Sequence, residues 1–80
     1  MATVEELSEK IRAVINEVTG IPLSEIRADS VLAEDLELDS LAIAEIVVAL
    51  DERLAIRISD DQIGALKTVN DLILHAVKSQ

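Results

Sequence analysis

The chain has 80 residues, which suits one small domain, and half of them are hydrophobic, which is enough to build a core. It contains no cysteine, so it forms no disulfide bond and offers no thiolate of its own, and it contains no aromatic residue, so the core is aliphatic. The net charge of −9 opposes binding to nucleic acids and to anionic membranes, and it favours protein partners with basic surfaces.

No stretch of the sequence is long and apolar enough to span a bilayer, and the N-terminus lacks a charged segment followed by an apolar one. We therefore expect no membrane insertion, a cytoplasmic location, and a single domain over residues 1–80. The negative charge is uneven, because residues 21–40 hold six acidic residues and only one basic residue.

The first predicted helix spans residues 4–18. Thr3-Val4-Glu5-Glu6 has the pattern of a capping box, with Thr3 as the cap. Apolar residues then recur at steps of three and four, as on one face of a helix: Val4, Leu7, Ile11, Val14 and Val18. Gly20 ends this helix, and Pro22 prevents its continuation.

Residues 20–39 show no sustained periodicity and predict a long connection, with a short helical turn at residues 24–26. Most connections in compact domains run to about 4–6 residues, so one this long is either functional or disordered. Apolar residues are spaced along it, which predicts that it packs against the core and is ordered: Ile21, Leu23, Ile26, Val31, Leu32 and Leu36.

The second predicted helix runs from Ser40 to about Leu54 and is apolar on two sides. One side is expected to face the core: Ile46, Val47, Leu50 and Leu54. The residues of the other apolar side recur at steps of three and four: Leu41, Ala44 and Val48. This second side is either exposed and able to bind a partner, or covered in a central helix that packs on both sides.

Two further capping patterns predict two more helices. Ser59 opens a short helix that includes Ile63 and Leu66, although Gly64 weakens it. Thr68 opens a final helix to about residue 77, with an apolar stripe of Val69, Leu72, Ile73, Ala76 and Val77. No segment has the period of two that is typical of a strand. We therefore predict an all-α fold, a small four-helix bundle of three longer helices and one short helix, with a long ordered loop between the first two helices.

The acidic loop contains an incomplete calcium-loop pattern. Asp35, Glu37 and Asp39 alternate like the first ligands of such a loop. A calcium loop that starts at Asp35 needs Gly at its sixth position and Glu at its twelfth. The chain has Ser40 and Ile46 there, so we expect no dedicated metal site.

His75 is the only histidine, and it lies far along the chain from Ser40. A hydrolase nucleophile requires a strained strand-to-helix turn and an oriented base, and the sequence predicts no strand. We therefore expect no catalytic residue and no enzymatic activity.

The segment Leu36-Glu37-Leu38-Asp39-Ser40-Leu41 lies where the acidic loop meets the second helix. Asp and Ser are both favoured at helix starts, so capping alone is the simpler interpretation of Asp39 and Ser40. The alternative is that the Ser40 hydroxyl carries a covalent attachment, since a phosphodiester there would be favoured by the positive end of the helix.

Several segments together resemble the acyl carrier proteins. They are Glu34-Asp35-Leu36, Asp39-Ser40-Leu41, Glu45 and Ala49-Leu50-Asp51-Glu52, with the helix end at Gly20, the turn at Ile58-Ser59-Asp60, and Thr68-Val69. The Asp-Ser-Leu triplet is a weak signal by itself. Within an acidic helical chain of this length, at this position, it is specific.

The resemblance implies that Ser40 receives 4'-phosphopantetheine from coenzyme A, transferred by a phosphopantetheinyl transferase, with Asp39 and Leu41 beside it. The thiol of this arm would hold acyl intermediates as thioesters. The carrier would deliver them to ketosynthases, acyltransferases and reductases with basic patches, in fatty acid or polyketide (specialised lipid) biosynthesis. The resemblance also implies a monomer without activity of its own.

The same resemblance assigns two further groups of residues. The residues that meet partner enzymes would be Glu37, Leu41, Ala44, Glu45, Val48, Asp51 and Glu52. The residues that line a site for the acyl chain between helices would be Ile43, Ile46 and Leu50.

The chain departs from the family pattern at several positions. Glu37 stands where glycine is usual, Ala42 and Arg53 stand where acidic residues are usual, and His75 stands where tyrosine is common. The partner face is thus more apolar and less acidic, which favours a specialised carrier over the general fatty acid carrier. The alternatives are a peptidyl or aminoacyl carrier, and an acidic helical adaptor without a prosthetic group.

Overall fold

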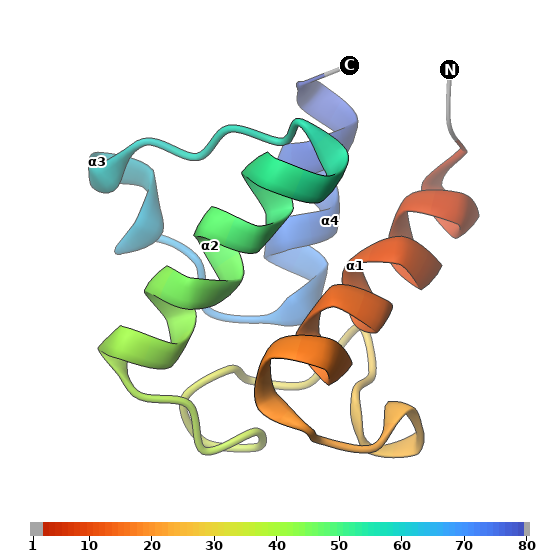
Figure 1. Cartoon of the computed structure of the whole chain (residues 1–80), viewed down its shortest axis with the longest axis vertical. Helices are drawn as coiled ribbons and strands as arrows, with labels where there is room; N and C mark the ends of the chain where they lie inside the picture. The colour runs from red at the N-terminus through yellow and green to blue at the C-terminus, as the bar shows by residue number, and fades with distance from the viewer. Residues whose placement is uncertain (1–2, 80) are drawn as a thin grey trace.

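The computed structural model describes residues 3–79, and these residues form four α-helices and one 3₁₀ turn (Figure 1). Their bounds in chain order are α1 Val4–Thr19, the 3₁₀ turn η1 Leu23–Glu25, α2 Ser40–Leu54, α3 Asp60–Ile63 and α4 Val69–Lys78. No strand occurs within the described residues, although Val31 and Thr68 form an isolated antiparallel bridge. The predicted all-α class, with three longer helices, one short helix and a long loop before α2, is confirmed.

The residues predicted to begin and end α1, Thr3 and Gly20, cap the helix at its two ends. The Thr3 hydroxyl accepts a hydrogen bond from the Glu6 backbone N–H at 3.1 Å. Gly20 adopts the left-handed conformation with φ 79°, and its N–H donates to the Asn16 carbonyl at 2.8 Å. Because both ends are capped by local contacts, their positions could be predicted from the sequence to within one residue.

The buried surface of α1 is wider than the predicted stripe. Val4 was expected in the core and is 55% exposed, whereas Ile15, which the stripe omitted, is fully buried. Val18 is half-buried. The reason is that α1 packs against both α2 and α4, so it buries two adjacent rows of side chains in the middle of the helix and leaves its first turn free.

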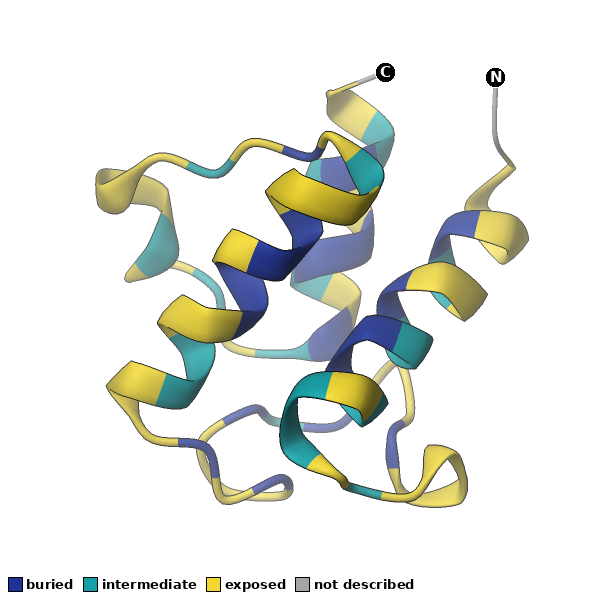
Figure 2. Ribbon diagram, in the orientation of Figure 1, coloured by how far each residue is buried: buried dark blue, intermediate teal, exposed yellow. Residues whose placement is uncertain are grey.

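One cluster of aliphatic side chains forms the core between α1, α2, α4 and the loop before α2 (Figure 2). Its largest fully buried side chains are Ile11, Ile15, Ile26, Leu32, Ile46, Leu50, Val69, Leu72 and Ile73. The inner sides of the three long helices carry most of the buried residues in Figure 2, while α3 lies at the edge and has none. Burial of this apolar surface is the main stabilising contribution in a domain of this size.

α3 is shorter than predicted. It begins at Asp60 as expected but ends at Ile63, so Leu66 lies beyond it, in the turn that leads to α4. Glycine inside a helix costs about 1 kcal/mol relative to alanine. α3 has no buried residue to offset that cost at Gly64, and the helix therefore stops there.

The loop over residues 20–39 is held to the core by apolar side chains. Its buried anchors are Ile26, Leu32, Leu36 and Leu38. Leu38 was not predicted as an anchor, and Leu23, which was, is 46% exposed. Leu23 is attached through its backbone instead, because its carbonyl accepts a hydrogen bond from Arg12 Nη2 at 2.8 Å.

Hydrogen bonds tie the same loop to two helices. On the α1 side, Arg12 Nε donates to the Ile26 carbonyl at 2.6 Å. On the α4 side, three backbone N–H groups donate across the gap: Leu32 to the Lys67 carbonyl at 2.8 Å, Val69 to the Ser30 carbonyl at 3.1 Å, and Asn70 to the Ala28 carbonyl at 2.8 Å. The loop therefore has one defined path, and the prediction that it is ordered agrees with these contacts.

Asp71 organises the turn that receives the loop. The backbone N–H groups of Lys67 and Thr68 donate to its carboxylate at 2.8 Å and 3.0 Å. Because these bonds favour the charged form, the one from Lys67 first and the one from Thr68 second, they lower the pKa of Asp71 below its ordinary value of 3.8. The Asp71 N–H in turn donates to the Thr68 hydroxyl at 3.2 Å, which completes the predicted capping box.

We expect Asp71→Ala to lower the free energy of unfolding by about 1 kcal/mol at neutral pH, because two backbone donors lose their acceptor. A carboxyl with a lowered folded-state pKa contributes its stability above the unfolded value of 3.8, and this contribution is lost as the pH falls through the lower folded-state pKa. Urea unfolding of both proteins between about pH 7 and about pH 3 should therefore give a difference that shrinks below about pH 4.

Asp71→Asn is the control, since its amide oxygen keeps an acceptor but does not titrate. Its stability relative to Asp71→Ala should not change with pH over this range. A wild-type advantage that persisted undiminished at the lowest pH would exclude the ionised carboxylate as the cause.

Candidate functional site

Ser40 lies at the start of α2 with its side chain at the surface. It is the first residue of the helix and is exposed. The cap is Asp39, which has extended backbone angles and accepts a hydrogen bond from the Ala42 N–H through Oδ1 at 2.8 Å. Capping therefore accounts for Asp39 and assigns no role to the Ser40 hydroxyl.

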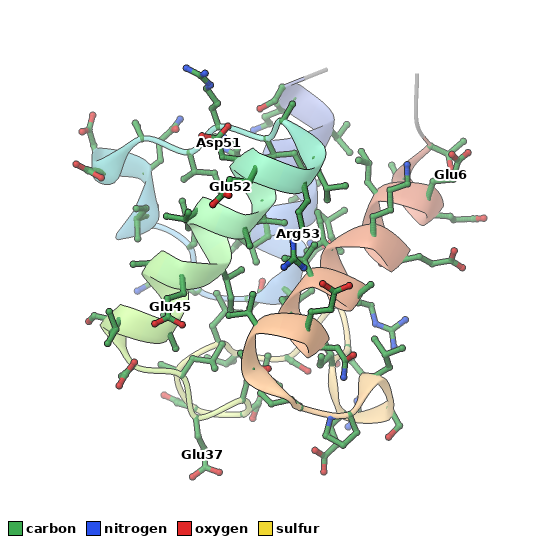
Figure 3. The ribbon with its side chains drawn as sticks, viewed as in Figure 1. Glu6, Glu37, Glu45, Asp51, Glu52 and Arg53 are labelled. Carbon is green, nitrogen blue, oxygen red and sulfur yellow. The ribbon has the colours of Figure 1, made fainter. Side chains whose placement is uncertain are left out.

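Two buried leucines fix the approach of the chain to Ser40. Leu36 and Leu38 are both buried, and the Leu38 N–H donates to the Leu32 carbonyl at 3.0 Å. Glu37 between them points away from the core (Figure 3). Its φ of 53° lies in the left-handed region, which explains why glycine suits this position and why a glutamate is strained there.

The electrostatics at Ser40 suit a negatively charged substituent. The first turn of α2 contains no acidic side chain. The backbone N–H groups of this turn form the positive end of the helix dipole. The Asp39 side chain accepts a hydrogen bond from one of them, the Ala42 N–H. An anion attached at Ser40 would therefore lie at the positive end of the helix dipole, with the capping carboxylate of Asp39 directly before it in the chain.

The outer side of α2 is exposed and apolar. Leu41 is 68% exposed, Val48 is 55% exposed and Ala44 is also exposed. In Figure 2 the exposed residues of α2 face away from the other helices and the buried ones face inward. Of the two alternatives for this helix, the structure excludes the one in which it is packed on both sides. The opposite side faces the core as predicted, except that Leu54 is only half-buried.

Acidic side chains accompany this apolar surface. Glu45, Asp51 and Glu52 are exposed and project from α2, and Glu37 projects from the loop below it (Figure 3). The structure thus places all seven predicted partner-binding residues at the surface, six of them on one helix: Glu37, Leu41, Ala44, Glu45, Val48, Asp51 and Glu52.

Two arginines flank this surface, and both are engaged in ion pairs. Arg53 pairs with Glu17 of α1. Arg57 lies in the connection after α2, with its Nε 3.6 Å from Asp51 Oδ1. Neither ion pair follows from a pattern in the sequence. Glu17 and Arg53 are too far apart in the chain to show a local signal, and the Asp51–Arg57 spacing matches no helical repeat.

The predicted acyl-chain residues are not at a surface hollow. Ile46 and Leu50 are fully buried in the core, and Ile43 is half-buried against it. Hollows border α2 toward α3, on its outer face and at its C-terminal end, and none of the three is lined by these residues. The acyl-chain site therefore stays a prediction, and it would require these side chains to move apart.

His75 is not close to Ser40. Its Nε2 lies 2.8 Å from the Arg57 carbonyl oxygen, beyond the C-terminal end of α2. Ser40 is at the other end of that helix, about 20 Å away at 1.5 Å per residue. His75 is thus a link between α4 and the connection after α2, and it is not placed to act as a base for Ser40.

Residues 3–79 contain neither a cluster of metal ligands nor a helix able to span a membrane. No group of three or more His, Cys, Asp or Glu side chains comes together in a way that could hold a metal ion. No described helix has the length and apolar character needed to cross a membrane.

Comparison with known proteins gives consistent matches. The family model for the phosphopantetheine attachment site matches residues 9–76. An acyl carrier protein of Acidothermus cellulolyticus is 42% identical over 69 residues, which are 86% of this chain and 82% of that protein. A meromycolate extension acyl carrier protein of Mycolicibacterium smegmatis is 35% identical over 77 residues, which are 96% of this chain and 78% of that protein.

A solved structure agrees with the fold. The solution structure of the apo doublet acyl carrier protein from prodigiosin biosynthesis matches with a TM-score of 0.79 and 28% identity. The match covers 92% of this chain, which spans only 36% of that longer one.

We expect Glu37→Gly to raise the free energy of unfolding by about 0.5–1 kcal/mol. A left-handed conformation costs an L-residue roughly 1–2 kcal/mol, and the greater freedom of glycine in the unfolded chain offsets part of the gain. Chemical denaturation of the variant and the wild type measures the difference.

The chain offers two controls for Glu37→Gly. Ala55 at the end of α2 also has a left-handed φ, 56°, so Ala55→Gly should stabilise in the same way. Ala44 lies inside α2, so Ala44→Gly should destabilise by about 1 kcal/mol. A loss of stability in Glu37→Gly like that of Ala44→Gly would contradict the assignment of strain to Glu37.

Proposed function

The chain belongs to the acyl carrier proteins, which bear a covalently attached 4'-phosphopantetheine, and from this premise we propose that Ser40 is the residue that bears it. The observation that carries the proposal is the division of roles at the start of α2. Asp39 makes the capping hydrogen bond, and the adjacent Ser40 is left exposed without that task. Both residues also lie inside the segment that matches the family model.

The protein is a carrier and not an enzyme. When attached, the prosthetic arm supplies the terminal thiol that this cysteine-free chain lacks, and that thiol holds an acyl group as a thioester. The chain itself has to present the Ser40 hydroxyl and tolerate a phosphodiester there. The helix N-terminus stabilises such a negative group by about 0.3–1 kcal/mol, and the exposed Leu41 beside Ser40 offers an apolar contact for the transferase.

Acyl carriers interact with phosphopantetheinyl transferases and with biosynthetic enzymes, and for this chain we propose the outer face of α2 as the contact surface. The exposed apolar residues Leu41, Ala44 and Val48 support this, since large exposed apolar patches are typical of interaction sites. The neighbouring carboxylates suit partners with basic patches, such as ketosynthases, acyltransferases and reductases. The cytoplasmic location expected from the sequence stays a prediction.

The chain works in lipid or specialised biosynthesis, and we propose the specialised kind. Two features support this choice. One relative is named for meromycolate extension and the structural match for prodigiosin biosynthesis. The partner face has Arg53 at a position where an acidic residue is usual in the family. Because the chain belongs to the acyl carrier proteins, we favour this function over a peptidyl or aminoacyl carrier and over an acidic helical adaptor without a prosthetic group.

We expect intact-mass analysis to show a gain of one phosphopantetheine when the chain is incubated with coenzyme A and a broad-specificity phosphopantetheinyl transferase. Ser40→Ala should show no gain, because the accepting hydroxyl is absent. Its free energy of unfolding should change by at most ~1 kcal/mol, since Asp39 still caps the helix.

Ser24→Ala is the matched control, because Ser24 is also exposed but lies in η1. It should be modified like the wild type. A mass gain in Ser40→Ala, or loss of the gain in Ser24→Ala, would remove Ser40 from its proposed role.

A second expected outcome concerns the pathway. The modified chain should bind a ketosynthase of general fatty acid synthesis at least about tenfold more weakly than that enzyme's own carrier, a difference of about 1.4 kcal/mol. Surface plasmon resonance with both carriers measures this ratio, and equal affinities would count against the specialised assignment.

A further inference from the structure

Val31 in the loop and Thr68 before α4 form the antiparallel bridge of this fold. The two hydrogen bonds of the bridge, of 2.8 Å and 3.1 Å, are made by the residues next to them in the chain. In this kind of antiparallel pair the N–H groups of the two opposed residues point away from each other. Each of these N–H groups therefore needs an acceptor outside the bridge.

An aspartate accepts from each of the two N–H groups. The Val31 N–H donates to Asp35 Oδ2 at 2.7 Å, and the Thr68 N–H donates to Asp71 Oδ2 at 3.0 Å. Asp71 acts at the start of α4, where it completes the capping box. Asp35 acts on the other segment of the bridge, in the acidic loop that leads to α2. The two carboxylates thus each hold one residue of the same junction.

The contacts of Asp35 close a turn over residues 31–36. The Asp35 and Leu36 N–H groups both donate to the Val31 carbonyl, at 2.8 Å and 3.2 Å, so Val31 is bound through both its N–H and its C=O. Val31 is half-buried, and a backbone N–H without an acceptor is costly there. The Asp35 carboxylate supplies that acceptor, and its charge makes the bond stronger than one between neutral groups.

The closed turn leads the chain directly to Ser40. Leu36 and Leu38 are buried after it, and the Leu38 N–H is hydrogen-bonded back to the loop at 3.0 Å. Glu37 between them has a strained left-handed backbone, which persists only where the surrounding contacts hold it. Only Asp39, the cap of α2, lies between Leu38 and Ser40. Opening of the turn would therefore loosen the segment that sets the start of α2.

We propose that Asp35 is a positioning residue for attachment of the prosthetic arm at Ser40, and that it acts through its hydrogen bond to Val31. The inference rests on the proposed function, because it takes Ser40 as the attachment site. It also accounts for the alternation of acidic residues before α2. Asp35 closes the turn, Asp39 caps the helix, and Glu37 between them is exposed. Two of these three carboxylates thus serve the backbone of the chain itself.

A contact with a partner enzyme is the alternative role for Asp35, and the two roles require different chemistry of the side chain. A contact with a cationic partner requires the negative charge, whereas the turn requires an oxygen that accepts a hydrogen bond. Asparagine keeps the acceptor and removes the charge, and alanine removes both. Comparison of the two substitutions therefore separates positioning from recognition.

The test is the kcat/KM for modification of the chain by a broad-specificity phosphopantetheinyl transferase with coenzyme A, followed by intact mass. Asp35→Ala should lower kcat/KM about fivefold, because the turn is closed in a smaller fraction of the molecules and the apparent affinity falls with that fraction. Asp35→Asn should stay within about twofold of the wild type, because its amide oxygen still accepts from Val31.

Two controls accompany these variants, at a temperature at which all of them are folded. Glu34→Ala removes the same charge from the adjacent exposed residue and should stay within about twofold of the wild type. Thr3→Ala removes the cap of α1 and lowers stability at the other end of the molecule from the start of α2 (Figure 1). It should be modified at the wild-type rate, since a lower stability by itself leaves the turn closed.

Amide hydrogen exchange of the unmodified chain, followed by NMR, measures the turn independently of Ser40. The N–H groups of Leu36 and Leu38 should exchange at least about tenfold faster in Asp35→Ala than in the wild type, because local opening becomes more frequent. In Asp35→Asn their exchange rates should match those of the wild type.

An equal loss of kcat/KM in Asp35→Asn and Asp35→Ala would assign Asp35 to partner contact and overturn the inference. Unchanged exchange at Leu36 and Leu38 in Asp35→Ala would overturn it as well. Its failure differs from a failure of the proposed function. A wild type that gains no phosphopantetheine would contradict the proposed function, whereas equal modification rates of the wild type and Asp35→Ala would contradict only the role of Asp35.

Discussion

The docking of the loop over residues 20–39 is the constraint on which the rest of the structure depends. Four buried aliphatic anchors hold this loop against the core, Arg12 bonds to it from α1, and backbone hydrogen bonds join it to the start of α4. A loop of this length costs entropy to order, and these contacts offset that cost. Because Leu36 and Leu38 are fixed, the point at which α2 begins is fixed too, and with it the position of Ser40.

At that point two neighbouring residues differ: Asp39 caps the helix, and Ser40 is the residue that we propose bears the prosthetic arm. Asp39 satisfies a free backbone donor of the first turn, while Ser40 beside it stays accessible. The helix end is positive, which would stabilise the phosphodiester that we propose is attached at Ser40. A chain without cysteine can in this way act as a carrier of thioesters, with the reactive chemistry supplied by the arm and the position supplied by the fold.

α2 connects the core to the proposed partner surface because it is apolar on two opposite sides. Its inner side is part of the aliphatic core, and its outer side leaves Leu41 and Val48 exposed. Exposed apolar surface is an aggregation risk unless charge surrounds it. The carboxylates of α2 and the loop supply that charge, and the net charge of −9 opposes close approach between copies of the chain. The same charges are suited to select basic partners.

Local signals in the sequence were sufficient for the three longer helices. Caps at Thr3, Asp39 and Thr68, and the glycine at position 20, act within one turn of backbone, so the ends of α1, α2 and α4 could be predicted to within about one residue. The segment around Ser40 could likewise be recognised, since it consists of consecutive residues.

What the sequence by itself determined was therefore the three longer helices, the acidic loop and the serine at the start of α2. Only the tertiary structure decided that Ile15 is buried and Val4 is not, since this depends on which helices α1 touches. It also decided that Arg53 pairs with Glu17 and Arg57 with Asp51. These contacts join residues from different segments, and their distances follow from how the helices pack around the core, which no local pattern specifies.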